Sequence, residues 1–275
     1  MEVRHWSERL FSFKCTRSAG LRFENGQFVM LGLEVDGRKV VRAYSIASAN
    51  YEEHLEFCSI KVPGGPLTSR LQHVERGSNL LVSTKPTGTL VLRDLKPGKR
   101  LILLATGTGI APFASIAKDP ETYEKFEQVI LLRGARCNAD LSYGDTVLRR
   151  LRDDLFLRDV VRERLLDYPT VTQEAGRHHG RVTSAVESGR VFTELGLTPL
   201  DSDSDRFMIC GNMRMLADAR ALLESRGFEP SPHIGVPGDY LVERAFVESL
   251  DPAVQDCRTS TLAIAAAIPA ASFGG

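Results

Sequence analysis

The stretch LILLATGTGIAPF (residues 101–113) decides the fold of the second half of the chain. A continuous apolar run is typical of a strand that is buried on both faces of a parallel sheet. The run leads into the turn TGTG and then into a predicted helix with Pro112 in its first turn, a position that suits proline. Glycines let a ligand approach the backbone, and a helix N-terminus favours an anion. The spacing differs from the G-x-G-x-x-G fingerprint, so the turn alone is equally typical of a connection that binds nothing.

The same layout returns at FMICGNMRML (residues 207–216), where a strand runs into the turn CGN before a helix. Other apolar runs, such as FEQVILLRGAR (126–136), alternate with amphipathic stretches such as SYGDTVLRRLRDDL (142–155). This alternation predicts a parallel sheet flanked by helices. Ligands bind beyond the carboxyl ends of the strands in such sheets, so we expect the two glycine-bearing turns to line one crevice. A lone cysteine in such a turn is more often a small buried residue than a reactive one.

The first third of the chain is typical of a small closed antiparallel barrel. Apolar-rich segments separated by Gly and Pro predict its strands: residues 10–17, 26–46, 54–62 and 78–92. Asp36-Gly37 predicts a tight hairpin turn, and LTSRLQHV (67–74) has the spacing of a short helix. The pattern changes at Pro97-Gly98. We therefore predict an antiparallel β-barrel over 1–97, an α/β parallel-sheet nucleotide-binding domain over 98–248, and a tail over 249–275.

The overall composition excludes several classes of protein. The chain has 275 residues, enough for two domains, and its 35 Lys and Arg balance its 35 Asp and Glu, which gives no indication of nucleic-acid binding. The cysteines are dispersed without metal-ligand or disulfide spacing, which favours a reducing compartment. The start of the chain is polar, and the longest apolar run (262–271) is shorter than the about 20 residues that span a bilayer. We expect a cytoplasmic monomer without membrane insertion, with a poorly packed tail.

The segment VRAYSIAS places a cation, an aromatic ring and hydroxyls in one strand-like run. Arg42 could pair with a phosphate, Tyr44 could stack on a flat ring, and Ser45 could hydrogen-bond a ring nitrogen. The alternative is a strand whose tyrosine packs inside the barrel. Arg136 and Arg181 each adjoin an apolar run, and the planar guanidinium suits phosphate. Either arginine alone is more typical of a solvated surface charge.

Eight segments occur in an order found in one known family: RAYS, IKVPGGPLTSRL, KPTGTL, TGTGIAPF, ARCNADLSY, GRVT, CGN and ERAFVE. Over residues 6–248, this order resembles the bacterial branch of the ferredoxin–NADP⁺ reductase family. The resemblance implies an N-terminal barrel that binds FAD and a C-terminal domain that binds NADP(H). It also implies an oxidoreductase in which NADPH gives a hydride to the flavin and single electrons pass to a partner, ferredoxin or flavodoxin.

The resemblance also implies roles for individual residues. Arg42 would hold the FAD pyrophosphate, Tyr44 would pack against the isoalloxazine ring, and Ser45 would hydrogen-bond near flavin N5. Cys210 would face the nicotinamide and complete the expected catalytic set with Tyr44 and Ser45. The other residues expected around FAD are Ala43, Cys58, Ile60, Lys61, Val62, Pro66, Leu67, Thr68, Thr108, Ala245, Phe246, Val247 and Glu248. The residues expected around NADP(H) are Arg136 and Arg181, as a clamp on the 2′-phosphate, with Gly211, Asn212 and Met213.

Three features depart from the family pattern. Gln173 stands where many bacterial relatives have arginine, which predicts a smaller preference for NADPH unless Arg177 replaces that cation. Arg133 stands where relatives often carry a histidine. The tail extends beyond the usual end of relatives near Glu248, and we expect its deletion to leave flavin content and activity intact.

Three alternatives to this function stay open. A reductase component of an oxygenase commonly carries a fused iron–sulfur domain with clustered cysteines, which this chain lacks, although a separate ferredoxin could connect it to such a partner. A non-catalytic electron-transfer subunit would bind FAD without NADP, and the two arginines favour the reductase instead. A free flavin reductase would lose its FAD during gel filtration.

Overall fold

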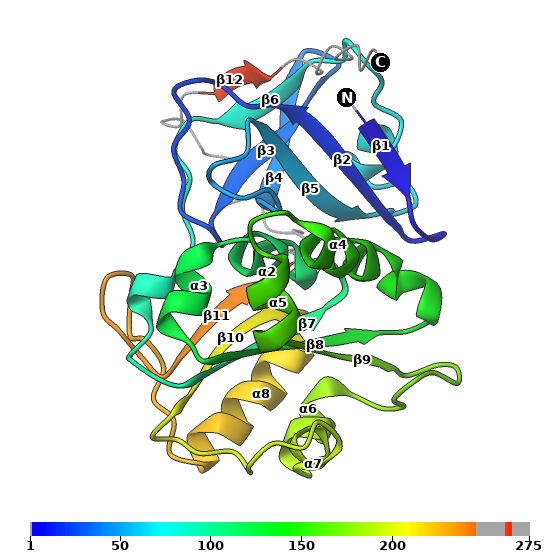
Figure 1. The fold of residues 1–275 in the computed structure, drawn as a ribbon. Coiled ribbons are helices and arrows are strands. Elements are labelled where there is room, and N and C mark those ends of the chain that lie inside the picture. Colours follow the sequence, from blue (N-terminus) through cyan, green and yellow to red (C-terminus); the bar gives the residue numbers. More distant parts are fainter. Residues whose placement is uncertain (1, 246–261, 266–275) are drawn as a thin grey trace.

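The structure, a computed structural model, describes residues 2–245 and 262–265. Figure 1 shows two stacked parts, with antiparallel sheets in the upper part and a parallel sheet flanked by helices in the lower part. The predicted fold class is confirmed by this arrangement.

The N-terminal part contains two antiparallel sheets. The first sheet has the order β1-β2-β5, with β1 (Glu2–His5), β2 (Leu10–Thr16) and β5 (His54–Ile60). The second sheet has the order β12-β6-β3-β4, with β3 (Phe28–Val35), β4 (Arg38–Ser45), β6 (Leu80–Ser83) and β12 (Leu262–Ala265). A backbone hydrogen bond from Ala47 N to Glu56 O (2.8 Å) joins the end of β4 to β5 and closes that corner of the barrel.

The turn between β3 and β4 shows why the hairpin forms where it does. Asp36 and Gly37 have φ values of 50° and 72°, and Val35 pairs directly with Arg38. Positive φ at both central residues is the geometry of the type I′ turn, which matches the twist of the flanking strands and favours Asp-Gly. The predicted hairpin is therefore confirmed.

Aromatic side chains fill the space between the two antiparallel sheets. Phe11, Phe13 and Phe57 are fully buried and lie in one cluster with Tyr44. The short helix α1 (Thr68–Leu71) adds Leu71 to the same cluster, as the spacing of its apolar residues predicted. The segment 78–92, predicted as strand, continues after β6 as loop and then the 3₁₀ helix η1 (Leu92–Asp94).

The C-terminal part is a five-stranded parallel sheet with the order β11-β10-β7-β8-β9. Its strands are β7 (Arg100–Thr106), β8 (Gln128–Ala135), β9 (Leu165–Val171), β10 (Asp205–Gly211) and β11 (Tyr240–Arg244). One face carries α2 (Ile110–Ala117), α3 (Pro120–Lys125), α4 (Ser142–Asp153) and α5 (Arg158–Arg164). The other carries α6 (Val182–Glu187), α7 (Arg190–Glu194) and α8 (Met213–Ser225). Two 3₁₀ helices follow β7 and β8, namely η2 (Gly107–Gly109) and η3 (Asn138–Leu141).

The continuous apolar run of β7 serves both faces of this sheet. Leu101 and Leu103 pack in the core beneath α2, α4 and α5, whereas Ile102 and Leu104 pack in the core beneath α6, α7 and α8. Side chains alternate between the two faces of a strand, so a strand covered on both sides needs apolar residues at every position.

The two parts of the molecule share buried contacts. The core beneath α2, α4 and α5 also includes barrel residues such as Leu10 and Cys58. The hydroxyl of Ser115 in α2 lies 2.8 Å from the backbone oxygen of Ser48 and 2.9 Å from Oδ1 of Asn25, so its one proton is shared between two acceptors, and all three residues are buried. These contacts hold the barrel against α2.

The tail contributes a strand to the barrel. Residues 262–265 form β12, which pairs antiparallel with β6 in the register Leu262↔Ser83 to Ala265↔Leu80. The expectation of a poorly packed tail is wrong for these four residues, because backbone pairing needs no periodic pattern of side chains. Among the helices of the described residues, none has the length and apolar character that a membrane crossing requires.

Candidate functional site

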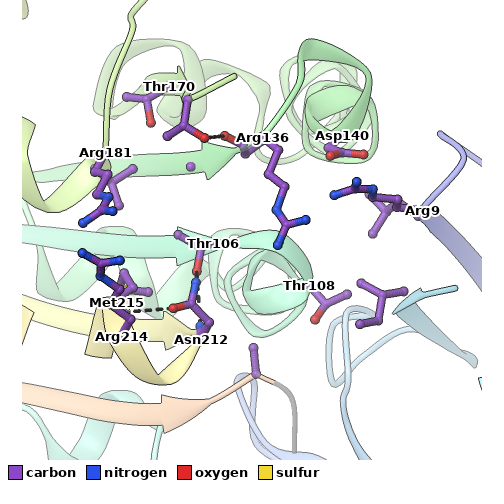
Figure 2. Close-up of a pocket in the computed structure, with 18 of the residues that line it drawn as sticks. Arg9, Thr106, Thr108, Arg136, Asp140, Thr170, Arg181, Asn212, Arg214 and Met215 are labelled. Atoms are coloured by element: carbon purple, nitrogen blue, oxygen red, sulfur yellow. Dashed lines mark hydrogen bonds between the residues drawn. The ribbon is translucent and has the colours of Figure 1, made fainter. Parts of the chain in front are cut away.

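A cavity of about 1000 Å³ lies between the barrel and the carboxyl edge of the parallel sheet (Figure 2). From the barrel it is lined by the turn before β2 and by the end of β5, including Arg9, Ile60, Lys61 and Val62. From the sheet it is lined by the segments that follow β7, β8, β9 and β10. A cavity of this size at this edge suits a nucleotide ligand.

The two glycine-bearing turns meet in the wall of this cavity, as the sequence predicted. A Cβ on Gly109 would lie 2.0 Å from the backbone oxygen of Cys210, and a Cβ on Gly211 would lie 2.2 Å from Oγ1 of Thr106. Glycine is therefore the residue that lets the two turns pack together. Asn212 then begins α8, because its Oδ1 accepts a hydrogen bond from Met215 N at 3.0 Å.

Five arginines line the cavity: Arg9, Arg136, Arg181, Arg214 and Arg244. Arg181 lies 3.9 Å from Asp218 of α8, whereas the guanidinium groups of Arg9, Arg136 and Arg214 have no partner among the described residues. Figure 2 shows Arg181 near Arg214 on one side of the cavity and Arg136 closer to Arg9 and the barrel. Free guanidinium groups around one cavity favour a ligand with several anionic groups.

Polar contacts tie the barrel to the sheet at the mouth of the cavity. The hydroxyl of Ser7 donates to Oδ1 of Asp140 in η3 at 2.6 Å. Lys61 Nζ in turn donates to the backbone oxygen of Ser7 at 2.8 Å. These bonds fix the segment after β8, which carries Arg136, relative to the barrel.

The cavity brings together part of the predicted site. Of the residues expected around FAD, it is lined by Ile60, Lys61, Val62, Thr108 and Ala245. Of those expected around NADP(H), it is lined by Arg136, Arg181, Asn212 and Met213, whereas Gly211 is buried behind the turn. Outside this cavity lie Arg42, Ala43, Tyr44, Ser45, Cys58, Pro66, Leu67 and Thr68. Phe246, Val247 and Glu248 lie outside the described residues.

Cys210 does not reach the wall of the cavity. Its side chain is fully buried in the core beneath α2, and burial raises the pKa of its thiol well above the usual range. A thiol in this environment stays neutral. Cys210 is therefore not part of the cavity lining, and its role toward the nicotinamide stays a prediction.

Tyr44 packs largely inside the barrel. Its ring meets Phe13 and Phe57 edge-on, with centroids 6.3 and 6.1 Å away, and its hydroxyl forms a 3.1 Å hydrogen bond with Ser59 Oγ. Burial raises its pKa to about 12. These contacts hold the ring in one orientation.

The neighbours of Tyr44 on β4 are more accessible. Ala43 is exposed, and the half-buried Arg42 donates from one guanidinium nitrogen to the backbone oxygen of Val41 at 2.7 Å, with no other partner among the described residues. Nearby, Thr68 Oγ1 accepts a hydrogen bond from Val62 N (3.1 Å), which closes the Gly64-Gly65 turn. Free guanidinium donors on an open strand face fit the pyrophosphate of a dinucleotide such as FAD.

Glu243, which does not line the cavity, is a carboxylate that the sequence interpretation missed. It accepts a hydrogen bond from Thr89 N (3.1 Å), and burial raises its pKa to about 7, partly offset by Thr89 and the nearby Ser45. It pairs in register with Cys210 across β10 and β11. The one signal in the sequence was a carboxylate within the apolar strand YLVER. A carboxyl with a pKa of about 7 can take up or release a proton near neutral pH.

Comparisons with known protein families cover most of the chain. The oxidoreductase FAD-binding domain matches residues 2–91, and the oxidoreductase NAD-binding domain matches residues 103–221. The ferredoxin–NADP reductase of Pseudomonas aeruginosa is 58% identical over 248 residues, which cover 90% of this chain and 96% of the relative. That of Azotobacter vinelandii is 55% identical with the same coverage. The flavodoxin/ferredoxin–NADP reductase of Rhodobacter capsulatus is 49% identical over 89% of this chain and 91% of the relative.

A solved structure has the same arrangement of domains. The ferredoxin NADP⁺ reductase from Neisseria gonorrhoeae, solved with bound FAD and NADP, is 28% identical with a TM-score of 0.79. The superposition covers 89% of this chain and 96% of that chain.

Proposed function

Because the chain belongs to the ferredoxin–NADP reductase family, we propose that its arginine-lined cavity binds NADP(H) and that the open face of β4 binds FAD. The protein is an FAD-dependent oxidoreductase that exchanges electrons between NADP(H) and ferredoxin or flavodoxin. The observation that supports the residue assignments best is the set of free guanidinium groups at the carboxyl edge of the parallel sheet. This set also favours a reductase over a flavin subunit that does not bind NADP.

The chain's own residues bind and orient the two cofactors in this proposal. Bound FAD supplies the exchange between hydride transfer and single-electron transfer. Arg42 would hold the FAD pyrophosphate, and Tyr44, held in place by Phe13 and Phe57, would pack against the isoalloxazine ring. Ser45 would hydrogen-bond near flavin N5, and the nearby Glu243, whose pKa is raised to about 7, would hold a proton close to Ser45.

The NADP(H) side of the site depends on cations. Arg136 and Arg181 bind phosphate, and Asn212 and Met213 line the path to the nicotinamide. Thr108 lies in the turn between the two cofactors. Each partly exposed arginine–phosphate contact is worth on the order of 1–2 kcal/mol, or roughly a tenfold change in kcat/KM.

Three broader proposals accompany this assignment. The FAD domain spans residues 1–97 and the NADP domain spans 98–248, with the boundary at Pro97-Gly98. The protein acts as a cytoplasmic monomer. Its partner is ferredoxin or flavodoxin, and nucleic acid is not among its ligands.

An anaerobic titration tests the proposed function directly. Addition of about one equivalent of NADPH should bleach the flavin absorbance, and subsequent addition of about two equivalents of oxidised ferredoxin, a one-electron acceptor, should restore it. Failure of both NADPH and NADH to bleach the flavin would exclude a reductase. Retention of tightly bound FAD after gel filtration separates this enzyme from a free flavin reductase.

Substitution of Arg181 tests the assignment of the phosphate site. Arg181→Ala should raise KM for NADPH roughly tenfold and leave kcat with NADH nearly unchanged, because NADH lacks the 2′-phosphate. The NADPH effect should shrink at high salt, since an exposed ion pair is screened. Arg177→Ala is the matched control, because Arg177 is exposed and does not line the cavity. Equal losses with both coenzymes would assign Arg181 to the fold instead.

A further inference from the structure

The segment from Gln173 to Arg177 contributes no cation to the cavity wall. Gln173 and Arg177 are both exposed, and neither lines the cavity. The backbone N–H of Gln173 donates to the backbone oxygen of Arg136 at 2.9 Å, so this segment packs beside Arg136 through its main chain. Besides Arg136 and Arg181, the guanidinium groups of the cavity wall come from other elements: Arg9, Arg214 and Arg244.

Arg214, in the first turn of α8, lies in the wall of the cavity. It is four residues before Asp218, and residues at this spacing lie on the same face of a helix with their Cβ atoms about 5–6 Å apart. Asp218 is also the residue 3.9 Å from Arg181. Arg181 and Arg214 therefore reach the same region, and Figure 2 shows them on the same side of the cavity.

The charges in this region are not balanced within the described residues. Arg181 and Arg214 bring two positive charges, and Asp218 is the one acidic residue of the cavity wall beside them. The distance from Asp218 to Arg181 is at the outer limit of an ion pair, and Arg214 has no ion-pair partner among the described residues. A phosphate monoester carries about two negative charges at neutral pH, whereas each phosphate of the pyrophosphate bridge carries one. The doubly charged group is the one that needs two adjacent guanidinium groups.

We propose that Arg214 is a specificity residue that binds the 2′-phosphate of NADP(H) together with Arg181. This inference rests on the proposed function, because it assumes that the cavity binds NADP(H). Asp218 opposes the phosphate by competing for both arginines.

The test compares charge-removing variants of the FAD-loaded protein. The variants are Arg214→Gln, Asp218→Asn and the control Arg220→Gln, which removes an exposed arginine of the same helix that does not line the cavity. Binding of 2′,5′-ADP and of ADP is measured by calorimetry, and kcat/KM is measured with NADPH and NADH. Since Arg214 is exposed at a helix start, Gln should leave the fold and FAD content unchanged.

Arg214→Gln should weaken 2′,5′-ADP binding and lower kcat/KM for NADPH roughly tenfold, with ADP and NADH within about twofold of wild type. Asp218→Asn should strengthen 2′,5′-ADP binding, and Arg220→Gln should change neither ligand. Unchanged 2′,5′-ADP binding in Arg214→Gln would overturn the proposal, and so would equal losses with ADP, which would assign Arg214 to the pyrophosphate. If the wild-type protein bound 2′,5′-ADP and ADP equally well, the proposed NADP(H) site itself would be wrong. If the wild type prefers 2′,5′-ADP and Arg214→Gln shows the same preference, the NADP(H) site stands and only the role of Arg214 is wrong.

Discussion

Replacement of Glu243 by Gln should change the way in which the stability of the protein depends on pH. Burial beside Ser45 and Thr89 raises the pKa of this carboxyl from 4.5 to about 7. The folded protein therefore binds a proton here more tightly than the unfolded chain does. The resulting stabilisation is complete below pH 4.5 and is lost as the pH rises through 7.

The size of the effect follows from the same pKa. One pH unit between the two pKa values is worth about 1.4 kcal/mol, which sets an upper limit of about 3 kcal/mol. The carboxyl is largely shielded from solvent, so we expect most of this limit, about 2–3 kcal/mol, to develop between pH 5 and pH 8. Gln keeps an oxygen that can accept the bonds from Thr89 N and Ser45, but it carries no charge at any pH.

Urea unfolding of both proteins at pH 5, 6, 7 and 8 measures this difference. The free energy of unfolding of Glu243→Gln should exceed that of wild type increasingly from pH 5 to pH 8. Glu187→Gln, which alters an exposed carboxyl on α6, should follow the wild-type curve. Parallel curves for wild type and Glu243→Gln would refute the shifted pKa and, with it, the proton-holding role of this carboxyl.

Three further predictions follow from single contacts. Arg42→Ala should weaken FAD binding by about 1.5–3 kcal/mol, the worth of a hydrogen bond to a charged group, and an unchanged dissociation constant would exclude Arg42 from the pyrophosphate site. Arg133 is buried and donates to both carboxylate oxygens of Asp167 at 2.7 Å. Arg133→Ala should therefore lower the free energy of unfolding by about 3–5 kcal/mol, measured in urea. A decrease of less than about 1 kcal/mol would mean that this ion pair does not stabilise the fold. Deletion of residues 249–275 removes β12 from the edge of β6. The Tm should therefore fall, by about 2–4 °C for each kcal/mol by which the free energy of unfolding decreases, while FAD stays bound. An unchanged Tm would mean that β12 adds no stability.

Features that depend on neighbouring residues could be predicted from the sequence. The Asp36-Gly37 turn was predictable because few residue pairs adopt positive φ at both positions. The apolar run of β7 was predictable because a strand covered on both faces has no polar side. The glycine turns after β7 and β10 could be assigned to one crevice, since parallel strands present their carboxyl ends at the same edge.

Features that depend on distant segments could not be predicted in this way. In the sequence, Arg133 stands out only as a residue that differs from the family pattern. The structure shows that its guanidinium group forms ion pairs with Asp145 and Asp167, which come from other elements. Cys210 follows the family pattern in the sequence, yet its side chain is buried in the core and not in the cavity wall. The burial of a side chain depends on which helix covers its strand, and the local pattern does not contain that information.

The sequence by itself determined the fold class, the two glycine turns and the family, because each of these depends on short segments and on their order. Only the tertiary structure decided which charges share one site. It placed Arg214 of α8 beside Arg181, which precedes α6, put Glu243 of β11 next to Ser45 of β4, and paired β12 with β6. Contacts of this kind form between residues far apart in the chain, so their energy is set by packing and charge in space and leaves no periodic signal in the sequence.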